Sequence, residues 1–206
     1  MTKPKLGLVM KELPKVNNMG HRTYVGGNWD YTGKKQFDFM IEEGLKPHHT
    51  FLDIGCGCFR GGRFFIDYLD KGNYFGVEKH SWLVVAGKKE IGNLVEEKNP
   101  RIEINDSFSF YPGVTMNYAL AKSVFTHLMK DRIKQCLTNL WPIIDGPFYA
   151  SISIGDSKNN PKEDHDNKRF VYSIDEIKEL AGDCWSVESL GNRGCHKQVM
   201  LKLCKK

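Results

Sequence analysis

The sequence lacks the features that mark several large classes of protein. No apolar run approaches the ~18 residues that a membrane-spanning helix needs, and no cysteines stand in a C-x-x-C arrangement or at zinc-ligand spacing. The lysines are spread along the chain, so the net charge of +5 does not by itself favour a nucleic-acid partner. The apolar stretch near the start is short and is followed at once by Lys11 and Glu12, unlike a signal peptide. We therefore expect a cytoplasmic protein that does not associate with membranes.

The length of 206 residues and the 40% hydrophobic content suit one well-buried domain. We place this domain at residues 34–206 and treat residues 1–33 as an N-terminal arm or lid, because residues 20–33 are dense in turn residues and show no sustained period. A lid would cover a ligand with Tyr24, Trp29 or Tyr31. An irregular arm packed on the domain for stability is an equal alternative.

The most informative stretch is residues 51–62, FLDIGCGCFRGG. An apolar segment ending on an acid, a glycine turn and a following helix together predict the first unit of an open α/β sheet, where ligands bind beyond the carboxyl ends of the strands. Gly55 and Gly57 have no Cβ, so a ligand can lie directly against the main chain. An ordinary turn with glycines for packing is the alternative.

The details of this turn limit the ligand. A dinucleotide fingerprint requires G-x-G-x-x-G, but its third glycine falls on Arg60, and Asp53 would repel a pyrophosphate. A positively charged ligand without phosphate, such as S-adenosylmethionine (SAM), suits the position better. The acid alternating with glycines resembles the first motif of class I (Rossmann-like) SAM-dependent methyltransferases. Phe59 stands where many members of that family have a third alternating glycine.

Two later strands end on acidic residues. Residues 73–78 end on Glu78, and a carboxylate at the tip of the second strand of such folds accepts hydrogen bonds from ribose hydroxyls. The alternative role for Glu78 is to cap a following helix whose apolar face would be Trp82, Val85 and Leu94. Residues 101–106 form a third strand, and the resemblance implies that Asp106 and Phe108 face the adenine, although Asn-Asp is also an ordinary turn.

The remaining chain completes an α/β pattern. We expect a helix from Lys34 to Glu43, strands at 117–122 and 147–154, a helix from about Thr126 to Leu140, a capping box at Ser173 and a terminal hairpin. The resemblance, which covers about residues 34–206, implies a seven-stranded, mostly parallel sheet flanked by helices, with an antiparallel last strand.

The resemblance also implies the cofactor, SAM, and a set of residues around it. The expected cofactor-binding residues are Asp53, Gly55, Cys56, Gly57, Arg60, Glu78, Asp106, Ser107, Phe108 and Ser123. We expect no metal, because the acidic loop at residues 155–168, with Asp156, Asp164, His165 and Asp166, has the composition of a solvated loop.

Methyl transfer needs positioning, and a base when the acceptor is a hydroxyl. His127, after the fourth strand, and His196, near the terminal hairpin, are the candidate bases, since imidazole titrates near neutral pH. Each histidine is as readily explained as a surface residue without a catalytic part.

The acceptor is constrained mainly by absences. An Asn/Asp-Pro-Pro-aromatic motif, typical of methylation at nucleobase amines, is absent after the fourth strand. Methylation at cytosine or uracil carbon relies on a nucleophilic cysteine, often after a proline, whereas Cys136 falls inside a predicted helix. The sequence favours a SAM-dependent methyltransferase acting on a small or medium-sized molecule, at oxygen. The alternatives are an RNA or protein methyltransferase and a non-catalytic SAM-binding regulatory protein; a nicotinamide oxidoreductase is disfavoured by Asp53. The sequence does not predict an oligomeric state.

Overall fold

The computed structural model describes residues 20–163, 168–193 and 198–206. The strands are β1 (Phe51–Ile54), β2 (Tyr74–Glu78), β3 (Arg101–Ile104), β4 (Tyr118–Ala121), β5 (Phe148–Ile154), β6 (Val171–Tyr172), β7 (Trp185–Ser189) and β8 (Gln198–Lys205). The helices are α2 (His21–Tyr24), α3 (Trp29–Glu42), α4 (Gly62–Tyr68), α5 (Ser81–Ile91), α6 (Leu94–Lys98), α7 (Lys130–Leu140) and α8 (Ile174–Ala181), with 3₁₀ turns η1 (Phe125–His127) and η2 (Ser157–Asn159). None of the helices in this part of the chain is long and apolar enough to cross a membrane.

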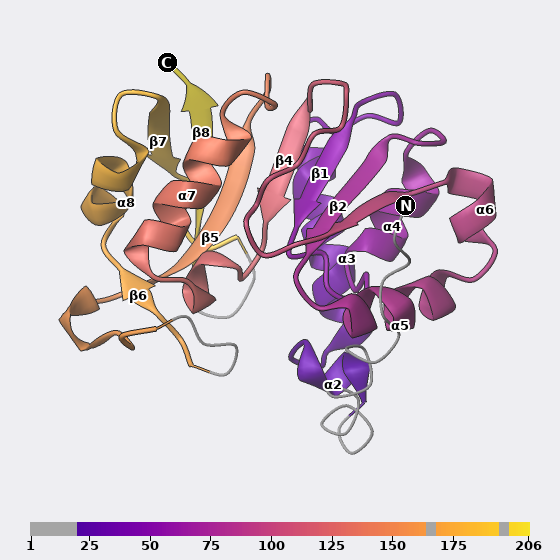
Figure 1. The fold of residues 1–206 in the computed structure, drawn as a ribbon, viewed down its shortest axis with the longest axis horizontal. Helices are drawn as coiled ribbons and strands as arrows, with labels where there is room; N and C mark the ends of the chain where they lie inside the picture. Colours follow the sequence, from indigo (N-terminus) through magenta and orange to yellow (C-terminus); the bar gives the residue numbers. More distant parts are fainter. Residues whose placement is uncertain (1–19, 164–167, 194–197) are drawn as a thin grey trace, which may run out of the picture.

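The strands form one sheet in the order β3-β2-β1-β4-β5-β8-β7, with the two-residue β6 paired to β5 (Figure 1). All pairs are parallel except those of β8, which runs antiparallel to both β5 and β7. The predicted α/β fold with an antiparallel last strand is confirmed. The carboxyl ends of the parallel strands therefore share one edge of the sheet with the start of β8, and in Figure 1 this is the lower edge, near α2.

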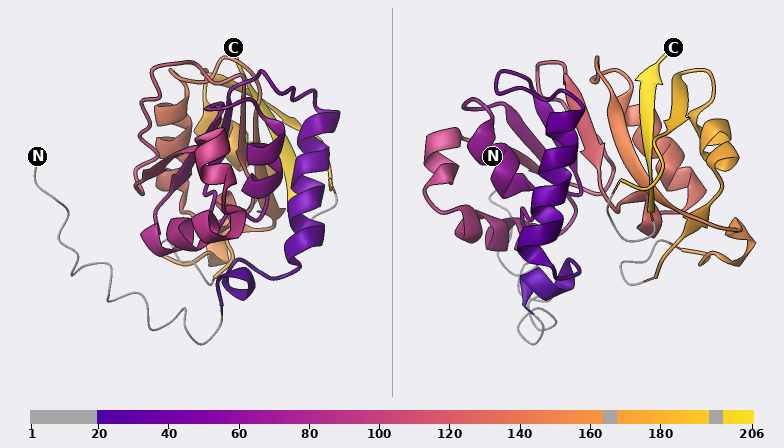
Figure 2. Two further views of the ribbon diagram at one scale, coloured as in Figure 1. Left: turned by 90° about the vertical axis from the view of Figure 1, so that its right-hand side faces the viewer. Right: turned by 180° about the vertical axis from the view of Figure 1, so that it is seen from behind.

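Helices cover both faces of the sheet (Figure 2). On one face, α7 and α8 pack on a cluster that includes Leu52 and Phe148. On the other face, α3, α4 and α5 pack on a cluster that includes Phe51 and Tyr74. Every residue of β1 and β2 is buried, as expected for inner strands covered on both sides. The helices on both faces thus enclose the inner strands that lead to the shared edge of the sheet.

The helix predicted at Lys34–Glu43 begins earlier, at Trp29, and residues 21–24 form α2, so the prediction of a loop through residue 33 was wrong there. Gly33 lies inside α3 for a packing reason. A Cβ on this residue would lie 2.2 Å from the carbonyl oxygen of Arg60, so only glycine allows the helix and the glycine turn to approach. Gly33 is therefore a close-packing residue of a helix and not the turn residue that the composition of residues 20–33 predicts.

Two other helix predictions need correction. The helix after Glu78 ends at Ile91, because Gly92 follows with φ of +52°, and Leu94 belongs to the separate helix α6. Val85 is 51% exposed and does not face the core. The helix expected from Thr126 is interrupted, because Leu128 and Met129 are extended between η1 and α7. The capping box at Ser173 is confirmed at the start of α8.

Candidate functional site

A cavity of about 630 Å³ lies at the shared edge of the sheet. Its walls come from the arm after α2, the turn after β1, and the ends of β2, β3, β4 and β8. The residues that line it include Tyr24, Val25, Gly26, Gly55, Gly57, Arg60, Glu78, Lys79, His80, Asp106, Phe108, Lys122, Ser123, Val124, Thr126, His127, Arg132, Arg169 and Gln198. Cavities of this size hold small molecules and cofactors.

The turn after β1 is built from left-handed backbone positions. Gly55 and Gly57 have φ values of +67° and +57°, and a Cβ on Gly55 would lie 2.6 Å from Cγ2 of Val124. Phe59 adopts the same left-handed region, with φ of +62°, although it carries a side chain. Its ring is fully buried against Gly62 and Gly87, and this packing offsets the backbone strain. The turn therefore keeps its shape without a third alternating glycine.

Glu78 links this turn to the start of α5. It is 6% exposed, and Oε2 accepts a hydrogen bond from the backbone N–H of Gly57 at 3.0 Å. Oε1 accepts another from the backbone N–H of His80 at 2.9 Å. Each carboxylate oxygen has further acceptor capacity, so Glu78 can also receive hydrogen bonds from a ligand in the cavity.

Asp53 lies beneath the turn and is not among the residues that line the cavity. Its Oδ2 accepts a hydrogen bond from the Tyr74 hydroxyl at 2.8 Å. Burial raises the pKa of Asp53 to about 7, and the Tyr74 hydrogen bond opposes part of this rise. Cys56 is buried nearby, next to Gly76, and burial raises the pKa of its thiol well above the usual range. The hydrogen-bonded Asp53 carboxyl and the buried Cys56 side chain thus support the turn from below.

The segment after β3 forms the opposite end of the cavity. Phe108 has φ of +58°, and the Arg132 guanidinium lies 5.2 Å from its ring centroid. Arg132 also donates to the carbonyl of Asp106, which holds this segment against α7. Asp106 and Phe108 line the cavity, whereas Ser107 does not; its hydroxyl donates to Asn105 Oδ1 at 3.4 Å.

Ser123 and Lys122 follow β4 directly. Ser123 has φ of +61°, and its N–H donates to Oγ of Ser151 at 2.7 Å. The Ser123 hydroxyl and the Lys122 ammonium both donate to Oε1 of Gln198, at 3.1 and 2.9 Å. The first residue of β8 thus fixes the end of β4.

His127 lies in η1 and lines the cavity. Its Nδ1 is 3.1 Å from the carbonyl oxygen of Lys168. Since a carbonyl only accepts, Nδ1 carries the hydrogen, and Nε2 is the basic nitrogen of the neutral ring. The other predicted base, His196, falls outside the described residues, as do Asp164, His165 and Asp166 of the acidic loop.

The arm closes one wall of the cavity. Tyr24, Val25 and Gly26 line it, and the Arg60 guanidinium donates to the carbonyl of Val25. Of the three aromatic residues predicted to form a lid, only Tyr24 reaches the cavity; Trp29 is buried in a cluster with Cys58, and Tyr31 is 64% exposed.

A carboxylate on α5 anchors the arm. Arg22 donates through Nε and Nη2 to the two oxygens of Glu90 at 2.8 and 2.7 Å, and His21 Nε2 lies 2.5 Å from the same carboxylate. The Arg22 hydrogen bonds lower the pKa of Glu90 to about 2. The arm is therefore held at both ends, by Glu90 and by Arg60.

Sequence reasoning missed several lining residues. Lys122, Gln198 and Arg169 come together only through the strand order, because β8 inserts beside β5 and β6 pairs with the end of β5. Lys122 carried a usable signal, since it is the last residue of the strand predicted at 117–122. Arg169 follows a charged loop and carried none.

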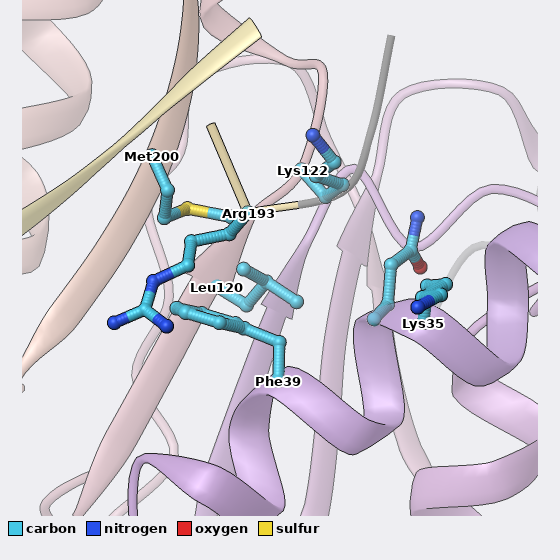
Figure 3. Close-up of a pocket in the computed structure, with 7 residues that line it drawn as sticks. Lys35, Phe39, Leu120, Lys122, Arg193 and Met200 are labelled. Atoms are coloured by element: carbon cyan, nitrogen blue, oxygen red, sulfur yellow. The ribbon is translucent and has the colours of Figure 1, made fainter. Parts of the chain in front are cut away.

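A second, much smaller hollow lies between α3 and strands β4 and β8, lined by Phe39, Leu120, Lys122 and Met200 among others (Figure 3). Its volume of about 10 Å³ is that of a single water molecule. The larger cavity is therefore the candidate binding site.

The fold and this site can be compared with known proteins. No protein-family model matches the chain, and no curated protein sequence matches it. Solved structures do match. Magnesium protoporphyrin IX methyltransferase from Synechocystis PCC 6803, crystallised with SAM, has a TM-score of 0.69 at 15% identity, covering 100% of both chains. The chain has the class I methyltransferase fold.

Other solved structures with this fold are similar to the chain to nearly the same degree. A SAM-dependent methyltransferase from Clostridium acetobutylicum ATCC 824 has a TM-score of 0.66 at 9% identity, covering 95% of this chain and 99% of its own. A glycopeptide N-methyltransferase complexed with S-adenosylhomocysteine has a TM-score of 0.65 at 12% identity, covering 86% and 90%. At such identities the likeness establishes the class I methyltransferase fold and not the reaction.

Proposed function

We propose that this chain binds SAM in the cavity and transfers its methyl group to a small or medium-sized acceptor, at oxygen. The observation that carries the proposal is the pairing of a left-handed glycine turn with a buried carboxylate, Gly57 with Glu78, at the carboxyl edge of a class I methyltransferase fold. Solved proteins with this fold bind SAM or S-adenosylhomocysteine. The volume of about 630 Å³ leaves room for a nucleoside-sized ligand and an acceptor.

The residues that line the cavity fit such a ligand. The exposed backbone at Gly55 and Gly57 would lie against the methionine portion, and the oxygens of Glu78 would accept hydrogen bonds from the ribose hydroxyls. Asp106 and Phe108 would bound the adenine.

Other residues of the expected set would act around this core. Ser123 would adjoin the methionine portion, while Arg60 would hold the arm over the turn. Asp53, Cys56 and Ser107 are not among the residues that line the cavity. We therefore assign them to holding the turn after β1 and the segment after β3 in place.

The division of the chain belongs to the same proposal. Residues 34–206 would supply the SAM-binding domain. The arm within residues 1–33 would close the site through Tyr24 and Val25, and the contacts of these two residues with the cavity support that role.

Bound SAM supplies a methyl group already activated by a positively charged sulfur. The chain itself would align the acceptor with that methyl group and exclude water. An acceptor hydroxyl that takes up the methyl group, leaving S-adenosylhomocysteine, would lose its proton to Nε2 of His127, since the carbonyl of Lys168 keeps the hydrogen of the neutral ring on Nδ1. His196 remains a second predicted base.

An acceptor screen tests this proposal. The purified protein is incubated with methyl-labelled SAM and a panel of hydroxylated, amino and carboxylic small molecules, and separately with total RNA and protein. We expect label in a hydroxylated small molecule. The His127→Gln variant should transfer label at least about a hundredfold more slowly, the usual scale for losing a general base, whereas His48→Gln, at the opposite edge of the sheet, should not. Label confined to RNA or protein, or absent throughout, would contradict the proposal.

A further inference from the structure

Among the described residues, acids line only one end of the cavity. The acids Glu78 and Asp106 lie at the ends of β2 and β3. Lys122 lies after β4, and Arg169 lies just before β6, which pairs with β5. Arg60, Lys79 and Arg132 also line the end that holds the two acids. Lys122 and Arg169 lie on the other side of β1, which separates β2 from β4 in the sheet, and no described acid lines the cavity there.

The two ends would serve different ligands, if the proposed function holds. The nucleoside would occupy the span from β3 to the β1 turn, where Glu78 and Phe108 lie. Neighbouring strands are ~4.8 Å apart, so β4, β5 and β8 extend the cavity edge by more than ~10 Å beyond β1. The acceptor would therefore bind at the basic end.

The described residues that line this basic end are Lys122, Ser123, Thr126, His127, Arg169 and Gln198, and they include no aspartate or glutamate. Lys122 donates to the side-chain carbonyl of Gln198 at 2.9 Å, a contact that orients the ammonium at this end of the cavity. Arg169 is exposed, and a guanidinium binds carboxylate and phosphate groups through two parallel hydrogen bonds.

We propose that the acceptor is an anionic molecule, whose carboxylate or phosphate group is held by Lys122 and Arg169 beside His127. This inference rests on the proposed function. The anionic group anchors the acceptor, and the reacting hydroxyl lies toward His127. An anionic group can form charge-assisted hydrogen bonds with both cations, whereas a neutral acceptor cannot. The site would therefore distinguish acceptors mainly by their negative charge.

Binding of simple probes tests this without knowledge of the acceptor. The protein is first titrated with S-adenosylhomocysteine and then, when saturated, with benzoate, phenyl phosphate and benzyl alcohol by calorimetry. We expect at least one anionic probe to bind at least about tenfold more tightly than benzyl alcohol, the scale of one charge-assisted hydrogen bond. The tighter of the two anions identifies carboxylate or phosphate as the anchoring group.

Substitutions locate the site. Arg169→Gln and Lys122→Gln should each weaken the anionic probe by about tenfold and leave benzyl alcohol unaffected. Lys71→Gln removes the same charge from an exposed turn at the opposite edge of the sheet and should change neither. Since Arg169 is exposed, its replacement should also leave affinity for S-adenosylhomocysteine intact.

Two kinds of failure are distinguishable. Absence of S-adenosylhomocysteine binding would overturn the proposed function. Normal binding of S-adenosylhomocysteine, with equal affinity for benzoate and benzyl alcohol or with an equal effect of Lys71→Gln and Arg169→Gln, would overturn the anionic acceptor alone.

Discussion

Oε2 of Glu78 and the backbone nitrogen of Gly57 lie 3.0 Å apart, so the tip of β2 holds the turn after β1 in place. Twenty-one residues separate them in the chain. The other oxygen of the same carboxylate accepts from His80 at the start of α5. A single buried acid thus joins three segments at the cavity wall. Its replacement should alter ligand binding and the shape of the turn together.

Glu78→Gln and Glu78→Ala separate these two effects. Glutamine retains one acceptor oxygen, whereas alanine retains none, so SAM affinity should fall by about 1 kcal/mol in the first and by up to about 3 kcal/mol in the second. Glu188→Gln, at an exposed position on β7, is the charge-matched control and should bind normally. Calorimetry with SAM measures all three variants. Equal affinity of wild type and Glu78→Ala would remove Glu78 from the site.

Gly55→Ala should destabilise the fold because the new Cβ would lie 2.6 Å from Cγ2 of Val124. We expect a loss of roughly 2–4 kcal/mol, combining left-handed strain with overpacking. Gly92→Ala is the control for strain alone, since Gly92 has φ of +52° and a Cβ there would meet nothing within 4 Å. Urea unfolding measures each variant.

The same clash predicts a rescue. Val124→Ala combined with Gly55→Ala should recover part of the loss, because it removes the clashing methyl groups, and the two substitutions should be non-additive. A Gly55→Ala cost no larger than that of Gly92→Ala, or strict additivity with Val124→Ala, would show that the contact is not the cause.

Asp53 should make stability depend on pH in an unusual direction. Its folded pKa is raised from 3.8 to about 7, so the folded chain binds this proton more tightly than the unfolded chain. The free energy of unfolding should therefore fall as pH rises from about 4 to about 7. Asp53→Asn still accepts from Tyr74 but does not titrate.

The measurement is the unfolding free energy of Asp53→Asn minus that of wild type at several pH values. We expect this difference to rise toward pH 8 by at most about 4 kcal/mol. Asp67→Asn, at an exposed position on α4, should give a flat line. A flat or falling line for Asp53→Asn would contradict the assigned burial of the carboxyl.

The arm should loosen when its carboxylate anchor is removed. In Glu90→Gln, Arg22 and His21 contact a neutral amide instead of a carboxylate. Amide hydrogen exchange at Tyr24 and Val25 should therefore accelerate by roughly fivefold. Exchange elsewhere should be unchanged, and the exposed Glu42→Gln on α3 serves as the matched control.

Acid should have a related effect on the arm. The pKa of Glu90 is lowered to about 2. The stabilisation of the arm by this carboxylate is therefore complete above the ordinary pKa of 4.5 and is lost as pH falls toward about 2. Protection of Tyr24 that is the same at pH 2 and pH 6, after correction for intrinsic rates, would argue against this anchor.

Most of the fold could be predicted from the sequence, because strands and helices produce periodic patterns of apolar residues. Acidic residues at the ends of the predicted strands also indicated the edge of the sheet where a ligand would bind. The antiparallel last strand was predictable only through resemblance. Local patterns could not predict the interior position of Gly33, since its cause is the distant carbonyl of Arg60. For the same reason they missed the break at Leu128, which places His127 in a short turn instead of a long helix.

The candidate site was predictable in part. Gly55, Gly57, Glu78, Asp106 and Phe108 lie on the cavity wall, as their positions at strand ends suggested. The basic end was not predicted, because Lys122, Arg169 and Gln198 meet only through strand insertion and β6 pairing. The position of Lys122 at the end of a predicted strand was a local signal, but its meeting with Arg169 and Gln198 left none.

The most direct test of the central claim is a calorimetric titration of the purified protein with SAM, repeated with S-adenosylhomocysteine, NADH and ATP. We predict micromolar binding of the first two, weakened in Glu78→Ala by up to about 3 kcal/mol, and no binding of NADH or ATP. Binding of NADH or ATP, with none of SAM, would contradict the assignment of the cavity.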